Sequence, residues 1–287
     1  EKLERWGSYT LVRPDPQAIW NTPRRHPGWK RYDARYARSH TGGGQWVKKD
    51  LPQRWQVRYG ALTFNIKPMN FKHTGLFPEQ AANWDFAQEQ IRRAGRPISV
   101  LNLFAYTGVA TLHAAAGGAK ETTTVDLSQT YLDWAARNLA SNGFAFEVAD
   151  KPNRRDRTGG GSSRGRRGGA ANKLVRADVT RWIAEARRRR DCYDLIFVDP
   201  PTFSNSKAMG RRTWDVQRDH VDLLISVSRL LADGGVAVFS CNLRTFKPAI
   251  EELGRCGVEL EDITARTIPH DFERNPRIHK CYLVRRK

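Results

Sequence analysis

The pattern of apolar and polar positions changes at about residue 70 of this chain. Before that point, residues 55–59 and 62–66 alternate apolar and polar side chains around a Gly-Ala turn, which predicts a β-hairpin. Prolines at positions 14, 16 and 23 exclude long helices from the preceding stretch. We therefore expect a small β-rich region whose five tryptophans either pack a small core, the interpretation we favour, or stack on bases.

From about residue 78, short apolar runs alternate with segments that have the period of a helix. The apolar runs predict strands at residues 100–103, 122–125, 174–175, 193–198 and 236–240, and two more near 258–266 and 279–285. The segments between them predict helices at residues 78–94, 108–116, 128–142, 179–190, 214–232 and 246–255. This alternation is typical of an α/β fold, a Rossmann-like sheet of seven mostly parallel strands with helices on both faces. The close spacing of the last two strands lets one of them pair antiparallel.

The alternation is interrupted at residues 151–171, which hold six glycines and seven basic residues against one acid, Asp156. Such a segment buries little apolar area, which predicts a disordered loop. The loop either makes weak contacts to phosphate or is a neutral insertion. We therefore expect two regions: a β-rich one at residues 1–70 and an α/β domain at residues 71–287 that carries the insert.

Charge and cysteine content narrow the choice of partners. The chain has 49 Lys and Arg against 30 Asp and Glu, a formal charge of +19, which favours a polyanionic partner such as RNA over an incidental basic surface. Its four cysteines show no metal-ligand spacing and suit a reducing compartment, so no metal is expected. No apolar stretch approaches the about 20 residues that cross a bilayer. The expected location is the cytoplasm, or an organelle if a leader preceded Glu1.

The motif Asp199-Pro200-Pro201-Thr202-Phe203 follows the buried run 195–198 and is the most informative stretch of the chain. Proline fixes φ and has no N–H donor, so the backbone carbonyls at this edge stay aimed at whatever enters the cleft. The Phe203 ring can stack on a flat base. A plain turn at a strand end is the alternative. In its context, the motif predicts a stiff ledge that holds a planar base beside a cofactor.

Three carboxylates are expected beyond the carboxyl ends of the strands, where ligands bind in an open α/β sheet. Asp126 can accept both hydroxyls of a ribose, Asp178 can accept from an adenine amino group or cap the next helix, and Asp199 ends a further strand. The loop at residues 102–108 has one glycine and lacks the G-x-G-x-x-G pattern of a dinucleotide site. An adenosine with a small charged tail, S-adenosylmethionine (SAM), fits this set better than NAD.

Several motifs resemble one known family. The stretch that begins with Lys72-His-Thr-Gly-Leu-Phe-Pro-Glu-Gln80 resembles class I SAM-dependent methyltransferases of the large-subunit (23S) rRNA type. Segments 199–207 and 215–220, with the tail 271–279, most resemble the guanine-N7 methyltransferase half of the bifunctional large-subunit enzyme. The resemblance covers about residues 60–287.

The resemblance implies a role for each matching residue. The residues that would hold SAM are Thr74, Phe77 and Gln80 at the methionine end, Asn102, Phe104 and Gly108 on the pocket floor, Asp126 at the ribose and Asp178 at the adenine. Those that would meet the methyl group and the substrate are Asp199 and Pro200, the Phe203 ring on the base, and Lys207 and Arg218 on phosphate. Residues 1–17 instead resemble single-function relatives, and the insert departs from both patterns.

Two chemistries remain open at this site. Guanine N7 carries an exposed lone pair, so alignment of donor and base suffices and no general base is needed. Cytosine C5 is a poor nucleophile, and a thiolate must first add to C6. Cys241 resembles the attacking cysteine of related cytosine-C5 enzymes, or it is an inert buried thiol. The downstream motifs favour guanine N7. A small-molecule or protein methyltransferase and a non-catalytic RNA-binding scaffold are further alternatives.

Overall fold

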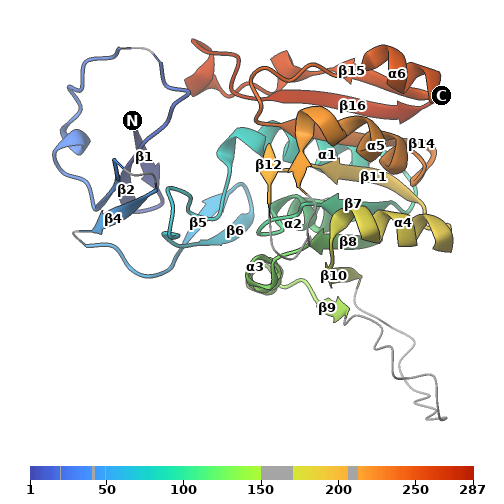
Figure 1. The fold of residues 1–287 in the computed structure, drawn as a ribbon. Coiled ribbons are helices and arrows are strands. Elements are labelled where there is room, and N and C mark those ends of the chain that lie inside the picture. Colours follow the sequence, from blue (N-terminus) through green and yellow to red (C-terminus); the bar gives the residue numbers. More distant parts are fainter. Residues whose placement is uncertain (20, 41–42, 49, 150–170, 206–212) are drawn as a thin grey trace.

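The computed structural model describes most of the chain (Figure 1). The described residues are 1–19, 21–40, 43–48, 50–149, 171–205 and 213–287. Lys207 and all of the predicted insert except Ala171 lie outside these ranges. Among the residues described, no helix combines the length and the apolar character that a membrane crossing requires.

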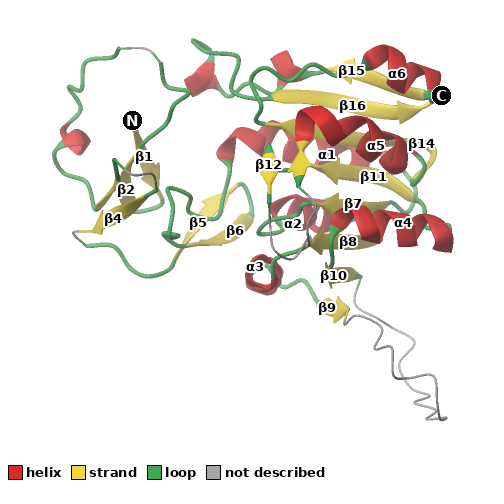
Figure 2. Cartoon of the chain, in the orientation of Figure 1, coloured by secondary structure: helices red, strands yellow, loops and turns green. Residues whose placement is uncertain are grey.

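Eight strands of the described chain form the central sheet, in the order β15-β16-β14-β11-β7-β8-β10-β9 (Figures 1 and 2). Their bounds are β7 Ser99–Leu103, β8 Glu121–Asp126, β9 Phe146–Ala149, β10 Asn172–Arg176, β11 Tyr193–Val198, β14 Leu231–Cys241, β15 Val258–Asp262 and β16 Lys280–Arg286. Strand β16 runs antiparallel to β14 and β15, and every other pair in this sheet is parallel. The predicted fold class, with its antiparallel strand near the C-terminus, is confirmed.

The sheet has one strand more than the seven predicted. The additional strand, β9, is four residues long at the edge of the sheet, and its side chains are exposed or half-buried. A short edge strand without a buried face leaves no apolar pattern in the sequence, so β9 escapes a prediction from periodicity.

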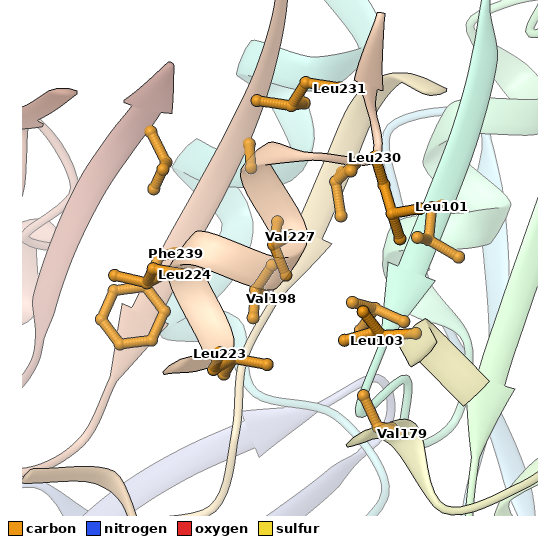
Figure 3. Close-up of a cluster of buried hydrophobic side chains, with 14 of the residues drawn as sticks. Leu101, Leu103, Val179, Val198, Leu223, Leu224, Val227, Leu230, Leu231 and Phe239 are labelled. Atoms are coloured by element: carbon orange, nitrogen blue, oxygen red, sulfur yellow. The ribbon is translucent and has the colours of Figure 1, made fainter. Parts of the chain in front are cut away.

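Helices cover both faces of the sheet. They are α1 Ala81–Arg93, α2 Val109–Ala116, α3 Gln129–Ser141, α4 Val179–Arg189, α5 Val216–Ser228 and α6 Ile250–Arg255. Helices α4, α5 and α6 contribute to one hydrophobic cluster, whereas α1, α2 and α3 contribute to two others. In the first cluster, Leu223, Leu224 and Val227 of α5 lie among Val198 and Phe239 of the sheet (Figure 3). This face of the sheet is therefore closed, and only the strand ends are available for a ligand.

Two helices are shorter than predicted. Helix α5 begins only after Trp214 and Asp215, which pair as β13 with strand β12, Phe203–Ser204. Helix α6 begins at Ile250, shortly after Pro248, which disfavours helical backbone at the residue before it. The side chains of Gln217 and His220 on α5 accept the backbone N–H groups of residues 247 and 249 there, at 2.9 and 3.0 Å.

The first 70 residues form strands, as predicted. Strands β1 Lys2–Trp6, β2 Tyr9–Arg13, β3 Ala34–Arg38 and β4 Gly44–Lys48 make one sheet, and β5 Trp55–Tyr59 with β6 Leu62–Ile66 make the predicted hairpin. Phe64 and Ile66 of the hairpin share a hydrophobic cluster with Leu112 of α2 and Leu132 of α3. The hairpin thus packs on the α/β domain, and the domain boundary at residue 70 stays a prediction.

The N-terminal region also contacts a loop close to the C-terminus (Figure 1). The Lys2 ammonium lies 2.9 Å from the Asp271 carboxylate and 4.3 Å from the centre of the Phe272 ring. The Asn275 side chain donates to the Gln17 carbonyl at 2.7 Å. These contacts hold β1 and the segment after β2 against the C-terminal loop.

Gly75 links the hairpin region to the α/β domain, and we expect Gly75→Ala to destabilise the protein by about 3 kcal/mol. Its φ is +100°, and an added Cβ would lie 2.2 Å from the Trp134 ring. Gly60→Ala is the matched control, because Gly60 also has positive φ (+56°) but has open space around its Cβ position. Urea denaturation of both variants measures the difference, and equal losses would contradict the role of the Trp134 contact.

Candidate active site

A cavity with an empty volume of about 510 Å³ opens at the carboxyl ends of β7, β11 and β14. The chain runs from β7 through β8 to β10 on one side and returns as β11 and β14 on the other, so the cavity lies where the strand order reverses. Ligands bind at this switch point in open α/β sheets. Its lining includes five of the predicted residues: Phe77, Gln80, Asn102, Phe104 and Asp199.

A chain of hydrogen bonds positions Asp199 at this cavity. Ser240 at the end of β14 donates from Oγ to Asp199 Oδ1 at 2.7 Å, and Gln80 Nε2 donates to Ser240 Oγ at 3.2 Å. Asn83 Nδ2 in turn donates to Gln80 Oε1 at 2.7 Å. Burial, and then the nearby Glu79 charge, raise the pKa of Asp199 to about 6, while the Ser240 bond opposes the shift. Asp199 is therefore an ionised, pre-oriented acceptor at neutral pH.

The loop after β7 is shaped by unusual backbone angles. Phe104 has a φ of 56° and Tyr106 a φ of 50°, and Gly108 follows with a φ of 72°. Positive φ costs about 1–3 kcal/mol at a residue with a side chain and persists where the surroundings over-determine it. Here Tyr106 N donates to Asp126 Oδ2 at 2.9 Å, and a Cβ on Gly108 would meet the Ala135 Cβ at 2.5 Å. Phe104 and Tyr106 of this turn both line the cavity.

Asp126 stands at the end of β8, as predicted, but does not line the cavity directly. Its carboxylate accepts from Ser128 N at 2.8 Å as well as from Tyr106 N, and burial raises its pKa. A carboxylate has about four acceptor positions, so capacity remains for a ligand hydroxyl. Contact with a ribose remains a prediction.

Three other predicted cofactor residues lie outside the cavity lining. Thr74 is fully buried, and its Oγ1 has no hydrogen-bond partner among the described residues. Asp178 caps α4, accepting from Arg181 N at 3.0 Å and from Thr180 Oγ1 at 2.6 Å, which is the alternative given for it above. Gly108 caps the start of helix α2 and packs against Ala135. The adenine contact of Asp178 stays a prediction.

The predicted ledge is anchored by a residue that the motif does not contain. Trp214 donates from Nε1 to the Pro201 carbonyl at 2.7 Å, and β12 pairs with β13 directly after the prolines. Phe203 is 57% exposed, which leaves its ring free to stack. Arg218 is also exposed, and it binds the Asp219 carboxylate and the carbonyl of Thr213, at 2.7 and 2.6 Å. Phosphate contact by Arg218 would have to compete with these bonds.

Cys241 is fully buried in the hydrophobic cluster that contains Phe239, Phe246 and Tyr282. Burial, with a further contribution from the Asp199 charge, raises the pKa of its thiol to about 12. The thiolate that a nucleophilic cysteine requires is therefore absent at neutral pH.

Sequence patterns missed Ser240, Tyr106, Trp214 and Asn83. Ser240 and Tyr106 have a usable signal, because Ser240 lies at the predicted end of a strand and Tyr106 lies within the loop at residues 102–108. Asn83 is placed by its bond to Gln80 on the same segment, and Trp214 by its bond to Pro201.

The cavity residues fit SAM. Aromatic walls (Phe77 and Phe104) suit an adenine ring and a sulfonium cation, and Asp199 supplies negative charge. The buried Thr74 hydroxyl, which no described residue satisfies, is a spare group near the segment expected to hold the methionine end. The fold and this crevice define a class I SAM-dependent methyltransferase, and the chain belongs to that family.

Comparison with known proteins agrees with this assignment. The chain is 41% identical over 251 residues to ribosomal RNA large subunit methyltransferase K/L of Syntrophotalea carbinolica, and 44% identical over 231 residues to the protein of that name from Allochromatium vinosum. These matches span 87% and 79% of the chain but only 31% and 26% of the relatives. The predicted resemblance to the large-subunit rRNA methyltransferases is confirmed, for about a third of their length. No protein-family model matches the chain.

Solved structures show the same fold. A SAM-dependent methyltransferase from Agrobacterium tumefaciens matches 99% of the chain and 86% of its own length, with a TM-score of 0.73 at 24% identity. The methyltransferase SMU.776, solved in complex with SAH, matches 89% of the chain and 62% of its own, with a TM-score of 0.64 at 19% identity. The predicted cofactor agrees with both.

Proposed function

We propose that this chain transfers the methyl group of SAM to N7 of a guanine in large-subunit (23S) rRNA. The observation that carries the proposal is Asp199 on the cavity lining, followed directly in the chain by Pro200, Pro201 and then the exposed Phe203. The names of the curated relatives support an rRNA substrate. The net charge of +19 suits contacts to phosphates, which should make RNA binding weaker at higher salt.

SAM, when bound, supplies an electrophilic methyl group, and the work of the chain is alignment. Phe77 and Phe104 would confine the cofactor, and the ledge carbonyls and Phe203 would hold the base in plane. Methylation at N7 leaves positive charge on the purine. The Asp199 carboxylate, held by Ser240, would stabilise this charge without taking a proton. The target base must first leave its stack, which costs a few kcal/mol and less in loops.

The burial of Cys241 favours guanine N7 over cytosine C5. A nucleophilic thiol must reach C6 of the base and must be ionised, and Cys241 is neither exposed nor acidic. Methylation of guanine N7 at the ledge requires no nucleophile from the protein.

The direct test is transfer from labelled SAM to unmodified 23S rRNA, followed by mass analysis of the nucleosides. We expect 7-methylguanosine. A 5-methylcytidine product would establish the alternative chemistry, and methylation of protein or a small molecule alone would remove RNA as the substrate. Absence of SAM binding in calorimetry would favour a non-catalytic RNA-binding scaffold.

Cys241→Ala separates the two RNA chemistries, and we expect it to keep transfer within about threefold of the wild type. Cys281→Ala is the matched control, because that thiol is equally buried and its pKa is also raised to about 12. Both variants lose buried volume and should lose similar stability. Transfer abolished only in Cys241→Ala, with SAM binding intact, would support cytosine C5.

A further inference from the structure

A second, larger cleft adjoins the cofactor cavity. Its empty volume is about 950 Å³, and it lies between β1, the segment at residues 72–79 and the C-terminal loop at residues 269–278. Phe77 lines both hollows, so the two meet at its ring. Anything held in this cleft therefore lies beside the cofactor cavity.

Most charges in this cleft neutralise one another. Arg13 donates to Glu4 at 2.9 Å, and Lys2 lies 3.5 Å from Glu4, 4.0 Å from Asp15 and 2.9 Å from Asp271. These contacts consume the carboxylates contributed by the N-terminal sheet and the C-terminal loop. They also fix the walls of the cleft, because they tie the N-terminal region to that loop.

Two charged groups of the cleft are left over. Neither the Glu79 carboxylate nor the Lys72 ammonium has an ion pair or side-chain hydrogen bond with another described residue. Both are half-buried, so each lacks much of the hydration that would otherwise satisfy it. An acceptor and a cation on one short segment, neither bound to the side chain of another described residue, indicate a ligand with donors and a phosphate.

Aromatic rings lead from the surface to the point where the hollows meet. Phe71 lies edge-on to His73, His73 to Phe77, and Phe77 faces Tyr106, each pair with centroids 5.0 Å apart. Burial, and then the charges of Lys72 and Arg13, lower the pKa of His73 to about 4, so its ring is neutral at physiological pH. Such a row of neutral rings suits a planar base.

We propose that this cleft receives the guanine to be methylated, with the Glu79 carboxylate accepting from its N1–H and N2 amino groups and Lys72 binding its phosphate. The inference rests on the proposed function, which it deepens by assigning the residue that selects the base. N7 lies on the opposite side of the purine from N1 and N2, so a guanine held by Glu79 leaves N7 free, and Asp199 is close enough to Glu79 to feel its charge. Adenine has an acceptor at N1 and no N2 amino group, so the same carboxylate excludes it.

Equilibrium dialysis of GMP, IMP and AMP against the SAH-bound protein tests the site without using the reaction. We expect GMP to bind about 10- to 100-fold tighter than AMP, as a bidentate base contact provides, with IMP between them because it lacks the N2 amino group. Glu79→Gln should remove this ranking. Glu89→Gln is the control, an exposed carboxylate that pairs with Arg93 on α1.

Three outcomes would overturn the inference: equal binding of the three nucleotides by the wild type, no nucleotide binding, or a ranking unchanged in Glu79→Gln. A loss of SAM affinity in Glu79→Gln would place Glu79 in the cofactor pocket and also overturn it. The proposed function fails separately, when the wild-type protein forms no 7-methylguanosine in rRNA.

Discussion

Asp199→Asn should lower kcat/KM for methyl transfer by about 100-fold or more, while it makes the folded protein more stable at neutral pH. The amide keeps an oxygen for the Ser240 hydroxyl, so the geometry of the ledge survives. What is lost is the negative charge that faces the developing purine cation. Transfer by the wild type should rise with pH through about 6, where Asp199 ionises.

The stability gain follows from the raised pKa. The folded-state pKa of Asp199 is about 6 against a reference of 3.8, so ionisation at pH 7.5 costs the wild type roughly 2–3 kcal/mol of unfolding free energy. The variant does not carry this cost. The difference should shrink as pH falls through 6 and vanish below 3.8, because the wild-type group is then protonated in both states. Urea denaturation at pH 7.5 and pH 5 measures it. A variant less stable than the wild type at pH 7.5, or one with full activity, contradicts the assignment.

Asp126→Ala should weaken SAM binding about 100-fold, the loss of two hydrogen bonds from ribose hydroxyls to a charged acceptor at about 1.5 kcal/mol each. Part of the effect comes through the loop after β7, because the carboxylate also accepts the Tyr106 and Ser128 amides. Isothermal titration calorimetry with SAM measures the affinity directly.

The control for this change is Asp133→Ala on α3, where the exposed carboxylate accepts from the Gln129 side chain. It should bind SAM as the wild type does. Unchanged affinity in Asp126→Ala would remove the ribose assignment. A Tm that falls without a change in affinity would leave Asp126 with a purely structural role.

Local chemistry and the family resemblance together made much of the site predictable. Asp199 directly follows a strand whose apolar run is plain in the sequence, whereas Phe77, Gln80, Asn102 and Phe104 were implied by the resemblance. All five line one cavity. Strand ends of a parallel sheet meet at one edge, so residues at those ends converge whatever lies between them.

No local sequence pattern decided the roles of Asp178 and Cys241. Asp178 caps a helix in the structure, and nothing in its neighbourhood separates a cap from an adenine contact. Cys241 follows the same kind of strand as Asp199, yet its side chain packs in the core. Side-chain direction at a strand end depends on pleat and register, which the contacts of the whole sheet decide.

The sequence by itself determined the order of strands and helices, the basic charge and the proline-stiffened ledge, since periodicity, composition and proline geometry act over a few residues. The tertiary structure alone decided which of these groups meet. Ser240 donates to Asp199 and Gln80 donates to Ser240, Trp214 anchors Pro201, and β1 closes a cleft with the C-terminal loop. Each of these contacts joins residues far apart in the chain, and it forms only once the packed core has brought their elements together.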